Sequence, residues 1–264
     1  DILAEEEKLP ELRDRRRLPE DIRIRESVEV LSVVDALKKH DKLVVLGAPG
    51  SGKTTFMRYL ALTFAQNLSH ERLELAEERL PILITLQDIA EALSKENTDE
   101  RKTIAGMLSG YIKTLQFDMP DGYFQPYLES GRCIVLFDGL DEVANIKQRG
   151  EVIEAVKLFA NLYKGNRYII TSRIAGYREI QPLPESDFAH FTIRDFDDEQ
   201  IKDFALKWYQ VRYPFEADKR ANDLIQAIER HPKVKQLAVN PLMLTIIAIV
   251  HRSSAELPNE RIKL

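Results

Sequence analysis

One stretch of eight residues constrains this chain more than any other. Gly47-Ala48-Pro49-Gly50-Ser51-Gly52-Lys53-Thr54 matches the phosphate-loop pattern of a glycine, four spacers and Gly-Lys-Thr. An apolar run at 43–46 precedes it, and apolar residues at helical spacing follow it over 55–62. This is the order in which backbone N–H groups and a helix N-terminus converge on phosphate oxygens. The stretch predicts that the chain binds a nucleoside triphosphate.

The residues of this loop have distinct expected tasks. Lys53 can reach the β- and γ-phosphates, and the Thr54 hydroxyl can take a position on Mg²⁺. The other candidates for nucleotide binding are Gly47, Pro49, Gly50, Ser51, Gly52 and Thr55. Glycine-rich turns between a strand and a helix also occur without a ligand. The match at every position of the pattern favours the nucleotide.

The composition excludes several classes of protein. The 264 residues are 44% hydrophobic with a net charge of -5, so a core can form but no broad basic face for nucleic acid is present. A single cysteine, Cys133, favours a reducing compartment. The apolar run at 242–250 is too short to span a bilayer, and the acidic N-terminus is unlike a signal peptide. We expect a cytoplasmic protein, and because the sequence lacks an initiating Met, part of a longer one.

Short apolar runs alternate with helical stretches, a pattern typical of a parallel sheet with helices on both faces. The runs that predict strands are 43–46, 80–86, 132–137, 167–171 and 188–193, and the intervening stretches that predict helices include 26–40, 103–115 and 152–162. After Asp197 the strands stop. Helical stretches at 198–209, 217–230 and 241–252 then predict a small helical subdomain.

Residues 1–25 are dominated by charge and contain two prolines, which predicts a linker leading in from an upstream domain. A short helix is equally compatible with this composition. An arginine patch for phosphate or nucleic acid is a weaker alternative, because acidic residues surround the arginines.

Further candidate residues stand at the ends of predicted strands. Asp138 follows the third strand, at the edge where parallel sheets bind ligands, and its carboxylate can hold Mg²⁺. Asp141 or Glu142 can orient or deprotonate the attacking water, and the spacing does not choose between them. Arg173 closes the fourth strand, where a guanidinium can contact the γ-phosphate. The simpler alternatives are helix capping for the acids and a surface ion pair for the arginine.

The ordered set of motifs resembles the NACHT module of the signal-transducing STAND ATPases. The resemblance rests on the phosphate loop, on Asp138-Gly139-Leu140-Asp141-Glu142 and on Ile169-Ile170-Thr171-Ser172-Arg173. Phe196 to Tyr209 resembles the segment that opens the helical domain of that family, and Asn240-Pro241-Leu242-Met243-Leu244 resembles its proline motif. The resemblance covers roughly residues 25–255.

The resemblance implies a P-loop NTPase of the additional-strand ATPase type. Its parallel five-stranded sheet would have the order 2-3-1-4-5, with helices on both faces and a small helical subdomain after it. The implied domains are a linker at 1–25, the nucleotide-binding domain at 26–195 and the helical subdomain at 196–264. The implied ligands are ATP or ADP with Mg²⁺. Thr54 and Asp138 would hold the metal, Arg173 would sense the γ-phosphate and Pro241 would contact the adenine.

The resemblance also implies a slow ATPase switch that is closed with ADP and self-associates with ATP. Such proteins have an upstream effector, downstream sensor repeats and a role in innate immunity or defence against phage. The winged-helix region that usually locks ADP in place would lie beyond Leu264.

Two alternatives remain open: an AAA-plus-like motor acting on DNA or protein, and a nucleotide-dependent scaffold that does not hydrolyse. The sequence has no Asn-Lys-x-Asp element for reading guanine, which argues against a GTPase, and no feature that identifies the acceptor site or lid of a small-molecule kinase.

Overall fold

The computed structural model describes residues 3–6, 30–94, 104, 106, 120, 122–180 and 182–253. The chain divides into two compact units. Of these described residues, those from 3–48 and 53–193 belong to the sheet unit, and those from 194–253 belong to the helical unit together with the loop tip Pro49–Gly52. Apart from residues 104 and 106, the helix predicted over 103–115 lies outside the described residues.

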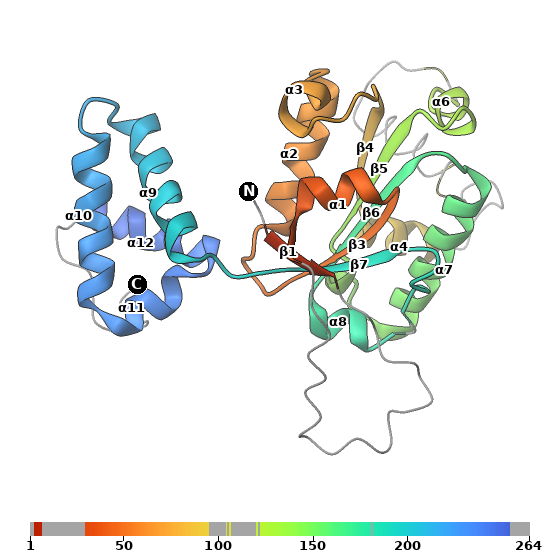
Figure 1. The fold of residues 1–264 in the computed structure, drawn as a ribbon. Helices are drawn as coiled ribbons and strands as arrows, with labels where there is room; N and C mark the ends of the chain where they lie inside the picture. Colours follow the sequence, from red (N-terminus) through yellow and green to blue (C-terminus); the bar gives the residue numbers. More distant parts are fainter. Residues whose placement is uncertain are drawn as a thin grey trace. The chain divides into compact units, whose positions relative to one another are not determined.

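The sheet unit is built on a sheet in which the described residues form seven strands (Figure 1). These are β1 Leu3–Glu6, β2 Val30–Ser32, β3 Lys42–Leu46, β4 Leu80–Thr85, β5 Cys133–Asp138, β6 Arg167–Ser172 and β7 Ala189–Ile193. They lie in the order β2-β1-β7-β3-β6-β5-β4. The five strands from β3 to β7 pair in parallel, whereas β1 is antiparallel to both β7 and β2.

The parallel core confirms the fold class expected from the alternation of apolar runs and helices. Its strand order differs in one respect from the expected 2-3-1-4-5. Strand β6 lies between β3 and β5, so that in order of appearance the parallel strands run 2-3-4-1-5. Apolar periodicity shows that a segment is a buried strand, but it carries no information about which strand lies beside it. The observed order makes β6, which leads into Arg173, the direct neighbour of both the phosphate-loop strand and the strand that ends in Asp138.

Two strands lie in stretches for which the sequence predicted a linker and a helix. Strand β1 pairs along β7 through Ala4 with Ile193, and β2 pairs along β1 in turn. Together they cover the backbone groups that β7 would otherwise expose at the sheet edge. The helix predicted over 26–40 begins only at Val33, after β2. Ser32 caps it by accepting a hydrogen bond from the N–H of Asp35 at 3.0 Å.

Helices cover both faces of the sheet (Figure 1). One face packs against α1 Val33–Lys39, α2 Lys53–Ala65 and α3 Ser69–Leu73, and the other against α4 Leu86–Ser94, α6 Gln125–Glu129, α7 Ile146–Leu162 and α8 Ile174–Arg178. Side chains alternate between the two faces along each strand. In β5, Ile134 and Leu136 enter the first core and Val135 and Phe137 the second, which is why this strand is apolar throughout.

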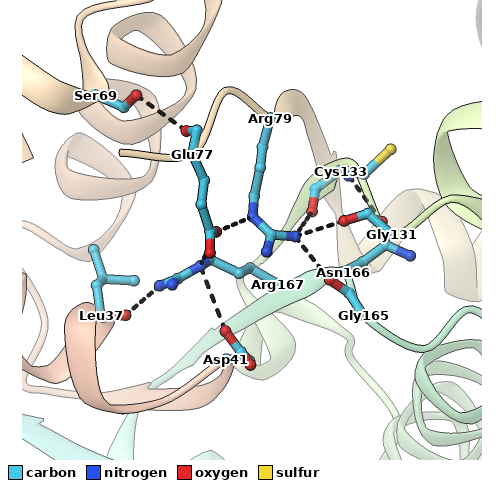
Figure 2. A network of polar contacts seen from close by, with 10 residues as sticks. All are labelled: Leu37, Asp41, Ser69, Glu77, Arg79, Gly131, Cys133, Gly165, Asn166 and Arg167. Carbon is cyan, nitrogen blue, oxygen red and sulfur yellow. Dashed lines mark hydrogen bonds and ion pairs between the residues drawn. The ribbon is translucent and has the colours of Figure 1, made fainter. Parts of the chain in front are cut away.

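Two arginines hold the amino ends of the parallel strands together (Figure 2). The Glu77 carboxylate accepts from Nε of Arg79 at 2.6 Å and from Nε of Arg167 at 3.3 Å, and the hydrogen bond from Arg79 is the main cause of the lowered pKa of Glu77. The carbonyl groups that accept from these arginines belong to Leu37, Gly131, Cys133 and Gly165. This network lies at the end of the sheet opposite to the phosphate loop, so we assign it to stability.

The helical unit contains α9 Asp198–Arg212, α10 Ala217–Arg230, α11 Pro232–Ala238 and α12 Pro241–Ser253. Its core includes Tyr209, Leu224, Ile228, Leu244 and Ile247. A capping box formed by Asp197 and Gln200 starts α9. The sequence predicted three helices. The additional short helix α11 begins at Pro232, because proline is well suited to the first turn of a helix.

No helix among the described residues has the length and apolar character needed to cross a membrane.

Candidate functional site

The phosphate loop lies where the sequence predicted it, between β3 and the start of α2 at Lys53. Thr54 and Thr55 are exposed in the first turn of this helix. The Lys53 ammonium donates hydrogen bonds to the carbonyl oxygens of Gly47 at 2.9 Å and Ala48 at 3.0 Å. These contacts fix the ammonium beside the backbone of its own loop.

The predicted charged residues act together on Lys53. Burial lowers the pKa of Lys53 and Arg173 lowers it further, whereas the carboxylates of Asp141, Asp138 and Glu142 raise it. The pKa of Lys53 therefore depends on each of the charged side chains that the sequence predicts for this site. Within the sheet unit, the charged residues that the sequence predicted lie at the carboxyl edge of the sheet.

Asp138 is the last residue of β5, and a buried threonine of β6 holds its carboxylate. The Thr171 hydroxyl lies 2.5 Å from Oδ1 of Asp138, and the N–H of Gly139 donates to the same hydroxyl at 2.9 Å. The sequence predicts no role for Thr171. Its only signal was a polar residue at the end of an apolar strand, and the strand order was needed to place it beside Asp138.

The two acids that the sequence left as alternatives have different environments. Asp141 accepts the backbone N–H of Arg173 through Oδ1 and pairs with Nε of Arg173 through Oδ2, both at 2.8 Å. Glu142 is exposed, and its side chain folds over Gly139, where an added Cβ would lie 2.9 Å from Cδ of Glu142. The carboxylate of Asp141 is thus committed to Arg173, whereas that of Glu142 has no ion-pair or hydrogen-bond partner among the described residues.

Arg149 of α7, for which the sequence predicts no role, supports the acidic turn. Nε of Arg149 donates to the carbonyl of Val143 at 2.6 Å and Nη2 to that of Asp141 at 3.4 Å. Its Nη1 pairs with the carboxylate of Glu179 at 2.6 Å. These contacts hold the 3₁₀ turn Leu140–Glu142 in place. No sequence pattern indicates this role, because it depends on how α7 packs against the turn.

The residues present fit a nucleotide with magnesium. Oγ of Ser51 is buried without a hydrogen-bond partner in the described part of the chain, and buried hydroxyls normally have one. A phosphate oxygen is a suitable acceptor at that position. The Thr54 hydroxyl and the Asp138 carboxylate are hard oxygen donors of the kind that Mg²⁺ prefers.

Within the helical unit, the loop tip Pro49–Gly52 packs against the start of α12. Nδ2 of Asn240 donates to the carbonyl of Pro49 at 2.9 Å, and the N–H of Leu242 donates to the carbonyl of Gly50 at 3.2 Å. Gly50 has φ +77°, and a Cβ there would lie 2.8 Å from Oδ1 of Asn240, so this close approach requires glycine. Pro241, the predicted adenine contact, is the first residue of α12, beside Asn240.

Comparison with known proteins identifies one matching family model, that of the NACHT domain, over residues 41–211. An uncharacterized WD repeat-containing protein of Nostoc sp. is 27% identical over 79% of this chain, and the chain spans 14% of the length of that relative.

Solved structures that are similar to this chain include two of DnaA. AMPPCP-bound DnaA from Aquifex aeolicus is 14% identical, with 75% of this chain and 59% of that chain covered and a TM-score of 0.40. Domain III of DnaA from Thermotoga maritima is 14% identical, with 86% and 83% covered and a TM-score of 0.41.

Proposed function

The chain belongs to the NACHT family, and we propose that it binds and slowly hydrolyses ATP as the switch module of a larger signalling protein. The observation that carries the proposal is geometric: Asp138, the turn that holds Asp141 and Glu142, and Arg173 meet at the ends of β5 and β6, next to the strand that leads into the phosphate loop. A loop that binds phosphate needs only backbone N–H groups and the lysine. The additional acids and the arginine provide what hydrolysis requires, a metal ligand, a residue to orient water and a cation for the γ-phosphate.

The phosphate loop would bind the β- and γ-phosphates through Lys53 and the backbone of Gly50, Ser51 and Gly52. The Thr54 hydroxyl and the Asp138 carboxylate would hold Mg²⁺, which when bound neutralises charge on the β- and γ-phosphates. Because Lys53 is already partly desolvated by the protein, it gives up little hydration when a phosphate arrives.

We assign the water-orienting role to Glu142 and not to Asp141. Both carboxylate oxygens of Asp141 are bound by Arg173, so neither is directed toward a water molecule at the γ-phosphate. Glu142 is exposed, its carboxylate lies over Gly139, and its lone pairs are left for water. Asp141 instead orients Arg173, whose side chain remains 54% exposed and leaves its terminal nitrogens for a γ-phosphate.

Hydrolysis would act as a signal through the helical unit. The tip of the phosphate loop is hydrogen-bonded to Asn240 and Leu242, so a change in the loop on nucleotide exchange would change the start of α12. We propose that the ATP state favours self-association of the full-length protein and that effector and sensor domains accompany the module in innate-immune or anti-phage signalling. The WD repeats of the Nostoc relative support the presence of further domains.

The proposal is tested with the purified chain and three variants. Nucleotide released by denaturation is identified by chromatography, and Mg²⁺-dependent ATP turnover is measured. We expect turnover below about one per second, the low edge of ordinary enzymes. Lys53→Ala should abolish ATP binding, whereas Glu142→Gln should retain binding and lose turnover by about a hundredfold.

Glu154→Gln on the exposed surface of α7 is the matched control and should behave like the wild type. Unchanged ATP binding in Lys53→Ala would contradict the site. Fast turnover that rises with added DNA or protein polymer would identify a motor in place of a switch.

A further inference from the structure

The contact between Asp138 and Thr171 has a fixed direction. Thr171 is fully buried in β6, and within the described part of the chain its hydroxyl is hydrogen-bonded to the N–H of Gly139 and to Oδ1 of Asp138. An N–H can only donate, so the hydroxyl oxygen accepts from Gly139. The hydroxyl proton is then donated to Oδ1 of Asp138, since a carboxylate has acceptors and no donor.

The same hydroxyl satisfies a backbone group that the sheet leaves unpaired. Pairing of β5 with β6 ends at Phe137 and Ile170, and Gly139 turns away with φ +78°. On this side of β5 its N–H donates to the Thr171 hydroxyl and not to a backbone carbonyl of β6. Because Glu142 lies over Gly139, Thr171 also fixes the backbone that carries the proposed water-orienting carboxylate.

We propose that Thr171 is a positioning residue for the magnesium-binding carboxylate, an inference that rests on the proposed ATPase function. With Oδ1 of Asp138 bound to the Thr171 hydroxyl, the rotation of the carboxyl group is fixed. Its other oxygen, Oδ2, has no hydrogen-bond partner among the described residues and is left for the metal or its water. Groups that orient a metal ligand in this way typically contribute about 10- to 100-fold to metal affinity.

The test compares Thr171→Val with Thr171→Ser. Valine has nearly the same shape as threonine but lacks the hydroxyl, whereas serine keeps it. The measurement is the Mg²⁺ concentration that gives half-maximal ATP turnover, together with the affinity for a fluorescent ATP analogue in EDTA. We expect valine to raise the half-maximal Mg²⁺ concentration about tenfold or more, with metal-free nucleotide affinity unchanged and serine within about twofold of the wild type.

A folded valine variant with the Mg²⁺ dependence of the wild type would overturn the proposal, as would an equal loss in the serine variant. A valine variant that loses metal-free nucleotide binding would also overturn it, because the residue would then act on the whole site. If valine prevents folding, Thr171→Cys, which retains size and a weak S–H donor, should give an intermediate rise, and no rise would refute the role.

The wild type separates this inference from the proposed function. A wild-type chain that binds the analogue and hydrolyses ATP supports the proposed function whatever the Thr171 variants show. A wild type that binds no nucleotide overturns both.

Discussion

Replacing Gly139 with alanine should greatly reduce the rate of ATP hydrolysis and should lower the free energy of unfolding only slightly. Gly139 has φ +78°, a conformation that costs an alanine about 1 kcal/mol. The new Cβ would lie 2.9 Å from Cδ and 3.0 Å from Oε2 of Glu142. Carbon atoms in contact are normally about 3.5 Å apart, so the carboxylate must move by roughly half an ångström or more. The end of a flexible, exposed side chain moves at little energetic cost. The loss of unfolding free energy should therefore stay near the cost of the positive φ at residue 139.

Turnover should respond to this movement. Displacing a catalytic group by a fraction of an ångström to 1 Å costs about 10- to 100-fold in rate, so we expect a loss of kcat in that range. ATP binding should be retained, because the phosphate loop is not altered. The assays are steady-state ATP turnover, equilibrium binding of a fluorescent ATP analogue and thermal unfolding of the same preparations.

Gly165→Ala is the matched control. Gly165 has φ +83°, but an added Cβ would make only an ordinary contact of 3.5 Å with Cα of Gly131, at the opposite edge of the sheet. Both variants should lower the unfolding midpoint by about 2–4 °C, and only Gly139→Ala should lose turnover. Wild-type turnover in Gly139→Ala would refute the role assigned to Glu142, and an equal loss in Gly165→Ala would attribute the effect to general destabilisation.

Two further predictions concern stability. Arg79→Met should lower the free energy of unfolding, measured with denaturant, by about 2 to 3 kcal/mol because several carbonyl groups and Glu77 lose their donor. Arg132→Met, at an exposed position nearby, should cost less than about 1 kcal/mol, and equal losses would contradict the assigned network. Asn240→Ala should destabilise α12 by about 1 kcal/mol through loss of its N-cap, seen as a lower unfolding midpoint. Asn240→Ala also removes the donor to the carbonyl of Pro49 in the phosphate loop, so ATP affinity should fall as well. Asn240→Ser should restore the cap but not this donor, so we expect it to recover the stability and not the ATP affinity. Full recovery of both would show that the contact with the loop is unimportant.

Elements with a strong local pattern could be predicted closely. All five predicted parallel strands are present with ends within one residue of the prediction, because each is an apolar run bounded by polar residues or glycine. Helix α7 begins at Ile146 and not at 152 as predicted. Its first turn is started by the Asn145 cap, although Gly150 and the charged residues there weaken the apolar pattern.

The candidate site also contains residues that a local sequence pattern predicts and residues that only the packing of distant segments identifies. The phosphate loop, Asp138 and Arg173 could be named from the sequence because glycine spacing and polar residues at strand ends are local signals. Thr171 and Arg149 could not be named, since the first acts on a residue 33 positions away and the second on a turn that α7 must pack against.

The sequence by itself determined that this chain has a phosphate loop, a parallel sheet and a helical unit, because these follow from contacts and periodicities within short segments. The tertiary structure alone decided that β6 lies between β3 and β5, and that Asp141 binds Arg173 while Glu142 stays exposed. These outcomes depend on which distant segments pack side by side. Strand pairing and ion pairs are chosen by the packing of the whole unit, and no local pattern encodes that choice.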